Sequence, residues 1–390
     1  MSFIDGVIEN RDRLDKITDR AAREMARALE DARQEAIKRV KERIKKYEKD
    51  GKIADSLRAR KELKSANADI QDALDEALGL TTRTLKAAKR EAFKKSFADT
   101  IVNVEAATGD EVSLGGSFNQ VFRKALARSE SKPVLGVKDD KAFEGVRKWS
   151  EKKLRSTFTE AIARGDGADT LARKISDITG VGQRAATRIA RTNMTAVMND
   201  AQKAVYDENS DVIRGYRWNA TLDGRTSLIC ATLHGKEWRI GEDPPGPPAH
   251  PNCRSVLIPV FKDEELQAEI DADEQRVRNI GGKGTQLIDG ETTFEEWLDR
   301  QSKDDRVEFI GSEIRETLWD KGYVKFEELV KPDLTPRTDE EAVQLALAKD
   351  PSNRELRGIA DEMEVKKKKL ADIRREERSL ARKQEFDQGE

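Results

Sequence analysis

The chain has 390 residues, enough for two or three domains that each bury a core without a disulfide or a metal. Charged residues make up 38% of the chain and aromatic residues only 5%, a composition that predicts much solvated helix surface and little compact core. The formal net charge is -2, from 73 basic and 75 acidic residues. This near-neutral balance excludes a global basic field that would hold nucleic acid non-specifically.

The sequence lacks the signals of membrane insertion and secretion. It contains no run of about 18 apolar residues, the length that a membrane-spanning helix needs. The first residues, from Met1 to Asp5, lack the basic and apolar regions of a signal peptide. These features predict a soluble protein that is made in a cytosol. In such a reducing compartment a disulfide is disfavoured, so metal binding is the first use to consider for the two cysteines.

Residues 1–135 form the first predicted region, and their pattern is helical. The 3-4-3 spacing of a coiled-coil heptad seam occurs at Ile37, Val40, Ile44 and Tyr47. Gly51 interrupts the seam, and apolar residues then resume at helical spacing, which predicts a helical hairpin. The seam would pack the two helices against each other or, alternatively, contact an oligomer or portal partner.

The second predicted region, 136–262, begins with helices. A Gly-Asp-Gly sequence at 165–167 predicts the end of one helix. Gly180 and Gly182 predict a second break, before a helix over 183–207.

Short strands follow these helices in the same region. Over 213–220, Tyr216, Trp218 and Ala220 would fall on one face of a strand, and Asp223-Gly224 predicts a turn after it. A proline-rich loop over 243–251 cannot be helical, and the apolar residues at 256–260 predict a second strand. We therefore expect a small α+β core among the helices.

The remaining predicted regions are a C-terminal helical segment, 263–335, and a charged helical tail, 336–390. A compact part of the former begins at Phe294. The tail has nearly balanced charge, which favours a solvated helix over a nucleic-acid-binding arm. The predicted fold class is mainly α with a small α+β core, in which long amphipathic helices flank a Cys/His knuckle and short β-strands.

Every cysteine and histidine of the chain lies in one short stretch: Cys230, His234, His250 and Cys253. Random placement would confine four residues so closely roughly one time in a thousand. Two close pairs joined by a proline-stiffened loop are the arrangement that a tetrahedral Zn2+ requires, and four protein ligands would make the site structural. The Pro251-Asn252 sequence predicts a tight turn that aims His250 and Cys253 the same way.

A buried polar cluster and a Cys230–Cys253 disulfide are the alternatives to a zinc site. A catalytic zinc is disfavoured, because the His-x-Glu and Cys-x-x-Cys pattern of the zinc deaminases is absent. A nuclease site at His250 and Asn252 would need another histidine as base or ligand, and only His234 remains. The sequence also lacks a Walker-type loop, a nucleophile elbow and a dinucleotide fingerprint. It therefore predicts no catalytic residues and no enzymatic activity.

Four motifs of the core region occur in a specific order: Ile-Ala-Arg-Thr-Asn at 189–193, Trp-Asn-Ala-Thr-Leu-Asp-Gly-Arg-Thr at 218–226, the segment 230–235, and Pro-Pro-Ala-His-Pro-Asn-Cys-Arg-Ser at 247–255. In these motifs the chain resembles the Mu F-like head-morphogenesis family, the minor head proteins of bacteriophages. The resemblance covers about 140–335. The family often has glutamate where this chain has Asn193 and cysteine where it has Ser255, so neither residue is counted as a ligand or ion-pair partner.

The resemblance implies a structural minor capsid protein of a tailed bacteriophage, bound to the portal or inner capsid and acting in head assembly, with genome packaging or delivery as a further role. It implies a location in the virion, and in the host cytoplasm during assembly. The expected partners are the portal protein, other capsid or scaffold proteins, packaged DNA at local contacts, and a second copy through the helical ends. No membrane partner is expected, and structural Zn2+ is the expected cofactor. The alternative is a zinc-dependent nuclease or nucleic-acid-binding module.

Overall fold

The computed structural model describes residues 3–49, 52–53, 57–164, 166–242, 244–273, 276–279, 285–288 and 292–387. The chain divides into two compact units, which we describe separately. The first contains residues 1–221, 235–277 and 287–291, and the second contains residues 222–234, 278–286 and 292–390. Helices dominate the described residues, and one three-stranded antiparallel sheet lies among them. The predicted fold class, mainly α with a small α+β core, is confirmed.

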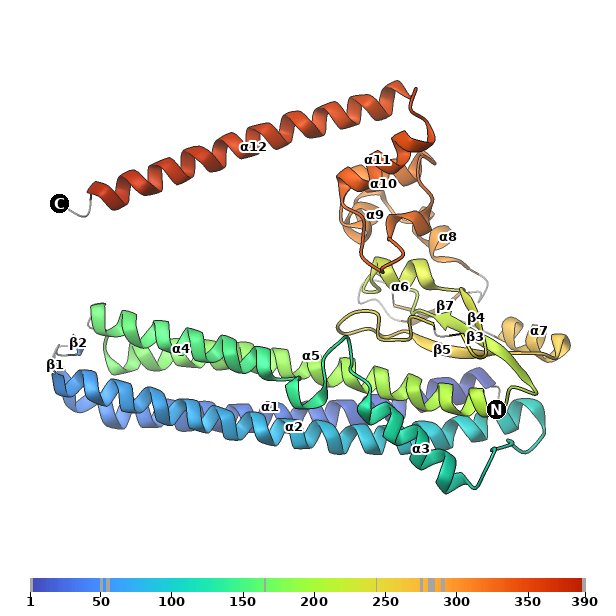
Figure 1. Cartoon of the computed structure of the whole chain (residues 1–390), viewed down its shortest axis with the longest axis horizontal. Helices are drawn as coiled ribbons and strands as arrows, with labels where there is room; N and C mark the ends of the chain where they lie inside the picture. Colours follow the sequence, from blue (N-terminus) through green and yellow to red (C-terminus); the bar gives the residue numbers. More distant parts are fainter. Residues whose placement is uncertain are drawn as a thin grey trace. The chain divides into compact units, whose positions relative to one another are not determined.

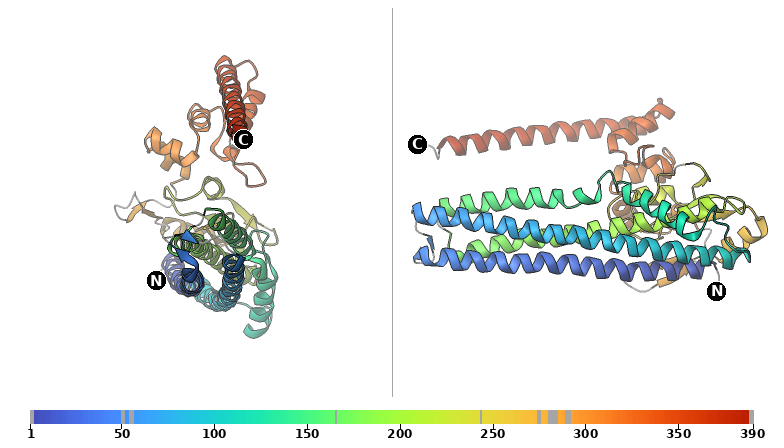
Figure 2. Two further views of the ribbon diagram at one scale, coloured as in Figure 1. Left: turned by 90° about the vertical axis from the view of Figure 1, so that its left-hand side faces the viewer. Right: turned by 60° about the horizontal axis from the view of Figure 1, so that its bottom comes forward.

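Long helices form the body of the first unit (Figures 1 and 2). They are α1 (Phe3–Ile44), α2 (Leu57–Thr108), α4 (Glu144–Arg164) and α5 (Ala168–Glu208), with the shorter α3 (Phe118–Ser131) packed on α2 and α5. α1 packs along both α2 and α5, and α1 and α2 form the helical hairpin that the sequence predicts. Short elements between these helices are η1 (Lys45–Tyr47), β1 (Glu48–Lys49), β2 (Lys52–Ile53) and η2 (Asp139–Lys141). Gly51, the predicted interruption, lies outside the described residues.

Along one face of α2, from residue 59 to residue 88, buried residues recur in steps of four, three and four: Ala59, Leu63, Ala66, Ile70, Leu74, Ala77, Thr81, Leu85 and Ala88. This repeat of 11 residues in three turns gives about 3.67 residues per turn, close to the period of a straight α-helix, whereas a heptad seam requires a left-handed supercoil. On α1 the predicted heptad seam is only partly buried. Val40 and Ile44 are fully buried, while Ile37 and Tyr47 are half-buried.

α5 runs without a break through Gly180 and Gly182, so the predicted break before residue 183 is wrong. A glycine inside a helix costs about 1 kcal/mol relative to alanine. The packing of α5 against α1, α2 and α4 offsets that cost. The predicted helix end at 165–167 is confirmed, since α4 ends at Arg164 and α5 begins at Ala168.

The sheet lies against α5 and has the strand order β4-β3-β5. Its strands are β3 (Ile213–Asn219), β4 (Glu237–Arg239) and β5 (Val256–Phe261), and both pairings are antiparallel. The strands predicted at 213–220 and 256–260 are confirmed, whereas the sequence did not predict β4. After the sheet come α7 (Glu264–Asp273), β6 (Arg276–Asn279) and β7 (Thr285–Ile288).

The second unit consists of short helices and one long one. They are α6 (Leu228–Leu233), α8 (Phe294–Asp299), α9 (Lys303–Ile310), α10 (Glu313–Asp320), η3 (Phe326–Leu329), α11 (Asp339–Lys349) and α12 (Arg354–Asp387). The rings of Phe294, Trp297 and Phe309 pack with centroids between 5.8 and 6.0 Å apart, which confirms the compact segment predicted to begin at Phe294. Among the described helices of the chain, none combines the length and apolar character that crossing a membrane requires.

Candidate metal centre

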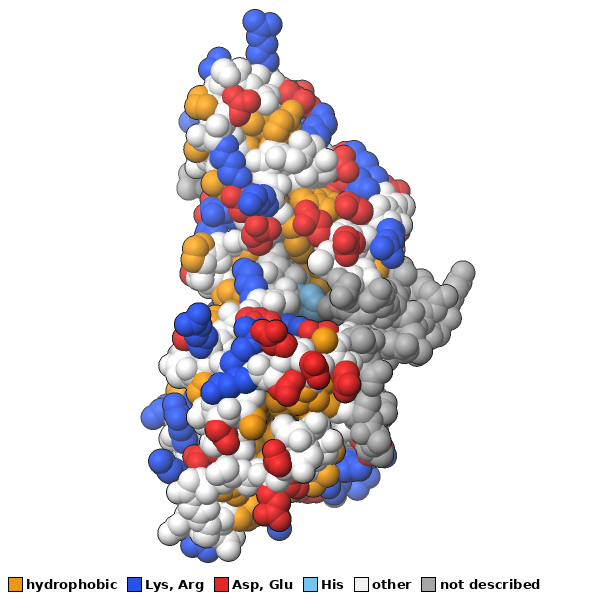
Figure 3. Space-filling model, turned by 90° about the vertical axis from the view of Figure 1, so that its right-hand side faces the viewer, with side chains coloured by type: hydrophobic (Ala, Val, Ile, Leu, Met, Phe, Trp, Pro, Cys, Tyr) orange, Lys and Arg blue, Asp and Glu red, His pale blue; other side chains and the backbone are white. Residues whose placement is uncertain are grey.

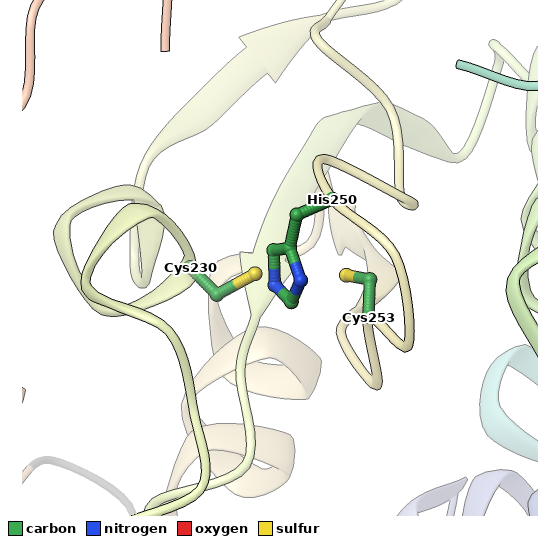
Figure 4. A group of neighbouring side chains, drawn as sticks. All are labelled: Cys230, His250 and Cys253. Carbon is green, nitrogen blue, oxygen red and sulfur yellow. The ribbon is translucent and has the colours of Figure 1, made fainter. Parts of the chain in front are cut away.

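His250 and Cys253 are brought together by a tight four-residue turn. The backbone N–H of Cys253 donates to the carbonyl of His250 at 3.2 Å. Pro251 fixes the first turn angle, and Asn252 has a φ of 60°, a left-handed conformation that asparagine tolerates better than most residues. This is the Pro-Asn turn that the sequence predicts. The His250 and Cys253 side chains lie beside each other in Figure 4.

Two threonines of α5 hold this turn through its backbone. The N–H of Asn252 donates to the hydroxyl oxygen of Thr192 at 3.0 Å. The hydroxyl of Thr195 donates to the carbonyl of Cys253 at 2.9 Å. Residues three apart lie on one face of a helix, so both threonines face the turn.

Asn199, four residues further along the same face of α5, holds the start of β5. Its side-chain oxygen accepts from the backbone N–H of Leu257 at 2.8 Å. Its amide nitrogen donates to the carbonyl of Thr195 at 2.8 Å and reaches that of Ser255 at 3.5 Å. We call Thr192, Thr195 and Asn199 the polar ladder. Sequence analysis missed it, although its spacing of three and four residues was a signal.

Cys230 lies in the first turn of α6, on the connection from β3 to β4. The hydroxyl oxygen of Ser227, the residue before the helix, accepts from the N–H of Cys230 at 3.2 Å. The preceding turn is built on Asp223, whose carboxylate is almost fully buried. That carboxylate accepts from the N–H of Arg225 at 3.0 Å and from the hydroxyl of Thr226 at 3.2 Å. The Asp-Gly turn predicted at this position is confirmed.

Cys230, His250 and Cys253 form a group whose ligand atoms all lie within 4.8 Å of one another (Figure 4). Neither cysteine is in a disulfide, and their side chains are only 1% and 2% exposed, while His250 is half-buried. Tetrahedral zinc with Zn–S bonds of about 2.3 Å holds its sulfur ligands about 3.8 Å apart, so small side-chain shifts would close the group around an ion. Two thiolates and an imidazole are also donors that zinc prefers.

The hydrogen bond of His250 orients its ring for metal binding. Its Nδ1 lies 2.8 Å from the carbonyl oxygen of Pro251. Because a carbonyl can only accept, Nδ1 carries the proton of the neutral ring, and Nε2 keeps the lone pair that a metal needs. Burial by itself lowers the pKa of His250. The hydrogen bond and negative charge of the Cys253 side chain outweigh burial and raise that pKa above its usual value.

His234 lies outside this group. It follows the last residue of α6, and its backbone N–H donates to the carbonyl of Cys230 at 3.1 Å. Its ring packs edge to face against Phe294, with the centroids 6.0 Å apart. The structure thus brings together three of the four predicted ligands and places His234 one helical turn from Cys230.

Residues 152–258 match the model of the family described as Phage Mu protein F like protein. The chain carries a Mu F-like region. This match confirms the resemblance found in the sequence motifs. Comparisons with curated proteins and with solved structures gave no match.

The Mu F-like region contains every part of the candidate metal centre. It includes α5 with its polar ladder, strands β3 and β4, and the start of β5. It also includes all four cysteines and histidines of the chain. The part of the protein that matches the family therefore comprises the end of α4, α5, most of the sheet and the two loops that carry the ligands.

Proposed function

We propose that the protein is a structural component of a tailed-phage head and acts in head morphogenesis. The observation that carries this proposal is the match of residues 152–258 to the Phage Mu protein F like family. In this role the protein is assembled in the host cytoplasm, resides in the virion and has no enzymatic activity.

The proposed partners are the portal protein and other capsid or scaffold proteins. Support comes from the long helices of the first unit, which offer extended charged surfaces for protein contacts. Acidic and basic side chains are interspersed over the face drawn in Figure 3, in keeping with a net charge of -2. A surface of mixed charge favours specific protein contacts over non-specific binding along DNA. Contact with packaged DNA is therefore proposed only as local.

Mass spectrometry of purified procapsids and mature particles tests this role. We expect the protein in both, at low copy number relative to the major capsid protein, and we expect it to co-purify with the portal. A chain that folds normally and yet is missing from both kinds of particle would refute the proposal.

The Mu F-like region is also proposed to hold one structural Zn2+. Its ligands would be Cys230, His250 and Cys253, with His234 as the fourth after its ring turns away from Phe294. Four protein ligands close the coordination sphere and leave no position for a substrate water. The nearly complete burial of both thiols supports a structural ion. The ion would tie the β3–β4 connection to the loop before β5.

The metal content of protein purified without chelator or nickel resin tests the zinc site. We expect about one zinc per chain, and we expect Cys253→Ser to lose it and to expose the proline-rich loop to proteolysis. In small zinc domains, zinc binding contributes on the order of 10 kcal/mol of apparent free energy to folding. Losing the ion should therefore greatly reduce the stability of this loop. Wild-type protein with no zinc, two reactive thiols and no gain in melting temperature on adding zinc would refute the site.

The variant His234→Phe tests whether His234 is the fourth zinc ligand. Phenylalanine keeps a ring against Phe294 but removes the nitrogen. We expect this variant to bind zinc at least 10-fold more weakly than wild type. Unchanged affinity would mean that the fourth position is open, as it is in catalytic zinc sites.

An open fourth position would favour the alternative function, a zinc-dependent nuclease or nucleic-acid-binding module. Incubation of the purified protein with plasmid DNA and divalent metals tests it directly. We expect uncut plasmid and only weak binding at physiological salt. Cleavage that disappears in Cys253→Ser would overturn the structural assignment.

A further inference from the structure

The C-terminal helix α12 carries a stripe that repeats every seven residues. With Leu356 at heptad position a, the a and d positions up to residue 380 are Leu356, Ile359, Met363, Lys366, Leu370, Ile373, Glu377 and Leu380. Six of these eight residues are apolar, and the two exceptions carry opposite charges. Such a seam is the surface through which helices pair in coiled coils.

α11 covers only the beginning of this seam, and from one side. Leu356 is fully buried and Met363 is half-buried where α11 packs on α12. Lys367, at position e, pairs with Glu340 of α11 at 2.7 Å, which places α11 along the e edge. Further along, the seam residue Ile373 is 53% exposed. Lys366 at the second d position is exposed as well, and so are Glu362, Lys369 and Glu376 on the g edge, so this part of α12 offers a face to a second helix.

The two charged residues of the seam select the direction of a partner helix. When two α12 helices run antiparallel, an a position of one faces a d position of the other. The register that sets residue 366 opposite residue 377 also sets 370 opposite 373 and 363 opposite 380. Between residues 363 and 380 every apolar position then faces an apolar one, and lysine faces glutamate twice. In a parallel pair, lysine would face lysine and glutamate would face glutamate, which is unfavourable in a seam.

Charges along the g edge favour the same antiparallel register. It sets Lys369 opposite Glu376 and Glu362 opposite Lys383 of the partner, so the two-fold symmetric pair has four contacts of opposite charge. Glu362, Lys369 and Glu376 are exposed in the single chain. At the e edge the register sets Lys367 opposite a like charge, but Lys367 already has Glu340 as its partner. We therefore expect the two helices to contact each other along their g edges, while α11 lies along the e edge.

We propose that α12 pairs antiparallel with the α12 of a second copy of this chain, with residue 366 opposite residue 377. The seam then contains six layers between residues 363 and 380, and α11 of each copy flanks one end. The proposal concerns association of the chain with itself, and it stands or falls separately from the role in head assembly.

Sedimentation velocity of the full chain over a range of concentrations tests the pairing. We expect a monomer–dimer equilibrium that Ile373→Asp shifts toward monomer by at least 10-fold in Kd. Val365→Asp is the matched control, because Val365 is also 53% exposed but lies at position c, away from the seam. Wild-type protein that stays monomeric up to about 100 µM, or equal effects of the two variants, would overturn the proposal.

Charge exchange within the seam tests the register and direction. We expect Lys366→Glu and Glu377→Lys each to weaken the dimer, because each sets like charges opposite one another. The double variant restores two opposite-charge layers and should recover the wild-type Kd within about threefold. A parallel pair would retain like charges in every one of these variants, so failure of the double variant to recover dimerisation overturns the antiparallel register.

Discussion

Replacing Asn199 with alanine tests whether the polar ladder holds the loop that carries His250 and Cys253. Asn199 is only 3% exposed, and its side-chain oxygen accepts from the N–H of Leu257 at 2.8 Å. Alanine leaves that N–H buried without its acceptor, which costs about 1–3 kcal/mol, and removes the bonds made by the amide nitrogen as well. We expect the connection between α5 and β5 to lose about 2–3 kcal/mol of stability.

Hydrogen exchange, followed by mass spectrometry on peptides covering 252–258, measures this loss of stability at the loop itself. A loss of this size should lower protection of the peptides roughly 30- to 140-fold, because about 1.4 kcal/mol corresponds to a factor of ten. Asn193→Ala is the matched control. Asn193 is 6% exposed on the same helix, and its amide donates to the carbonyl of Ile189 within α5 at 2.9 Å. Equal loss of protection in both variants would show that the ladder does not hold the loop.

Two further predictions concern close contacts elsewhere in the fold. In Gly215→Ala the new Cβ would lie 2.3 Å from the carbonyl oxygen of Trp238, so β3–β4 pairing should weaken by about 1–3 kcal/mol in thermal unfolding, whereas Gly224→Ala enters open space and should be neutral. Lys89 and Asp139 pair at 2.6 Å with side chains 3% and 11% exposed, so Asp139→Ala should cost about 3–5 kcal/mol, and adding Lys89→Met should recover most of it. Equal melting temperatures of the single and double variants would contradict the second prediction.

The two longer strands and the ligand turn could be predicted because their signals are local. Tyr216 and Trp218 alternate with polar residues, and Pro251-Asn252 has the turn chemistry that the structure uses. β4 gave no such signal, because it has three residues and both of its charged ones are exposed. It becomes a strand only because the edge of β3 offers it backbone partners, and such long-range pairing leaves no trace in a three-residue pattern.

In the long helices, local sequence signals predicted features that the structure does not have. Gly180 and Gly182 are helix-breaking by propensity, yet α5, which packs against α1, α2 and α4, continues through them. The 3-4-3 spacing around Val40 fits a heptad over two turns. The buried positions along α2 follow the 11-residue repeat instead. Only a long stretch of sequence distinguishes an 11-residue period from a seven-residue one.

The spacing of the candidate metal centre predicted which residues gather but not which side chains face one another. In Cys-x3-His the two residues are four apart, and a continuing helix would present them on one face. α6 instead ends at Leu233, and His234 takes a ψ of 136°, which leaves its ring against Phe294. Where a six-residue helix ends is a balance of small terms that spacing does not encode. A bound zinc would change that balance, because a fourth ligand gains more from coordination than an edge-to-face ring contact of about 0.5–1.5 kcal/mol provides. The side-chain position of His234 is therefore the feature of this centre that should differ most between the metal-free and the zinc-bound protein.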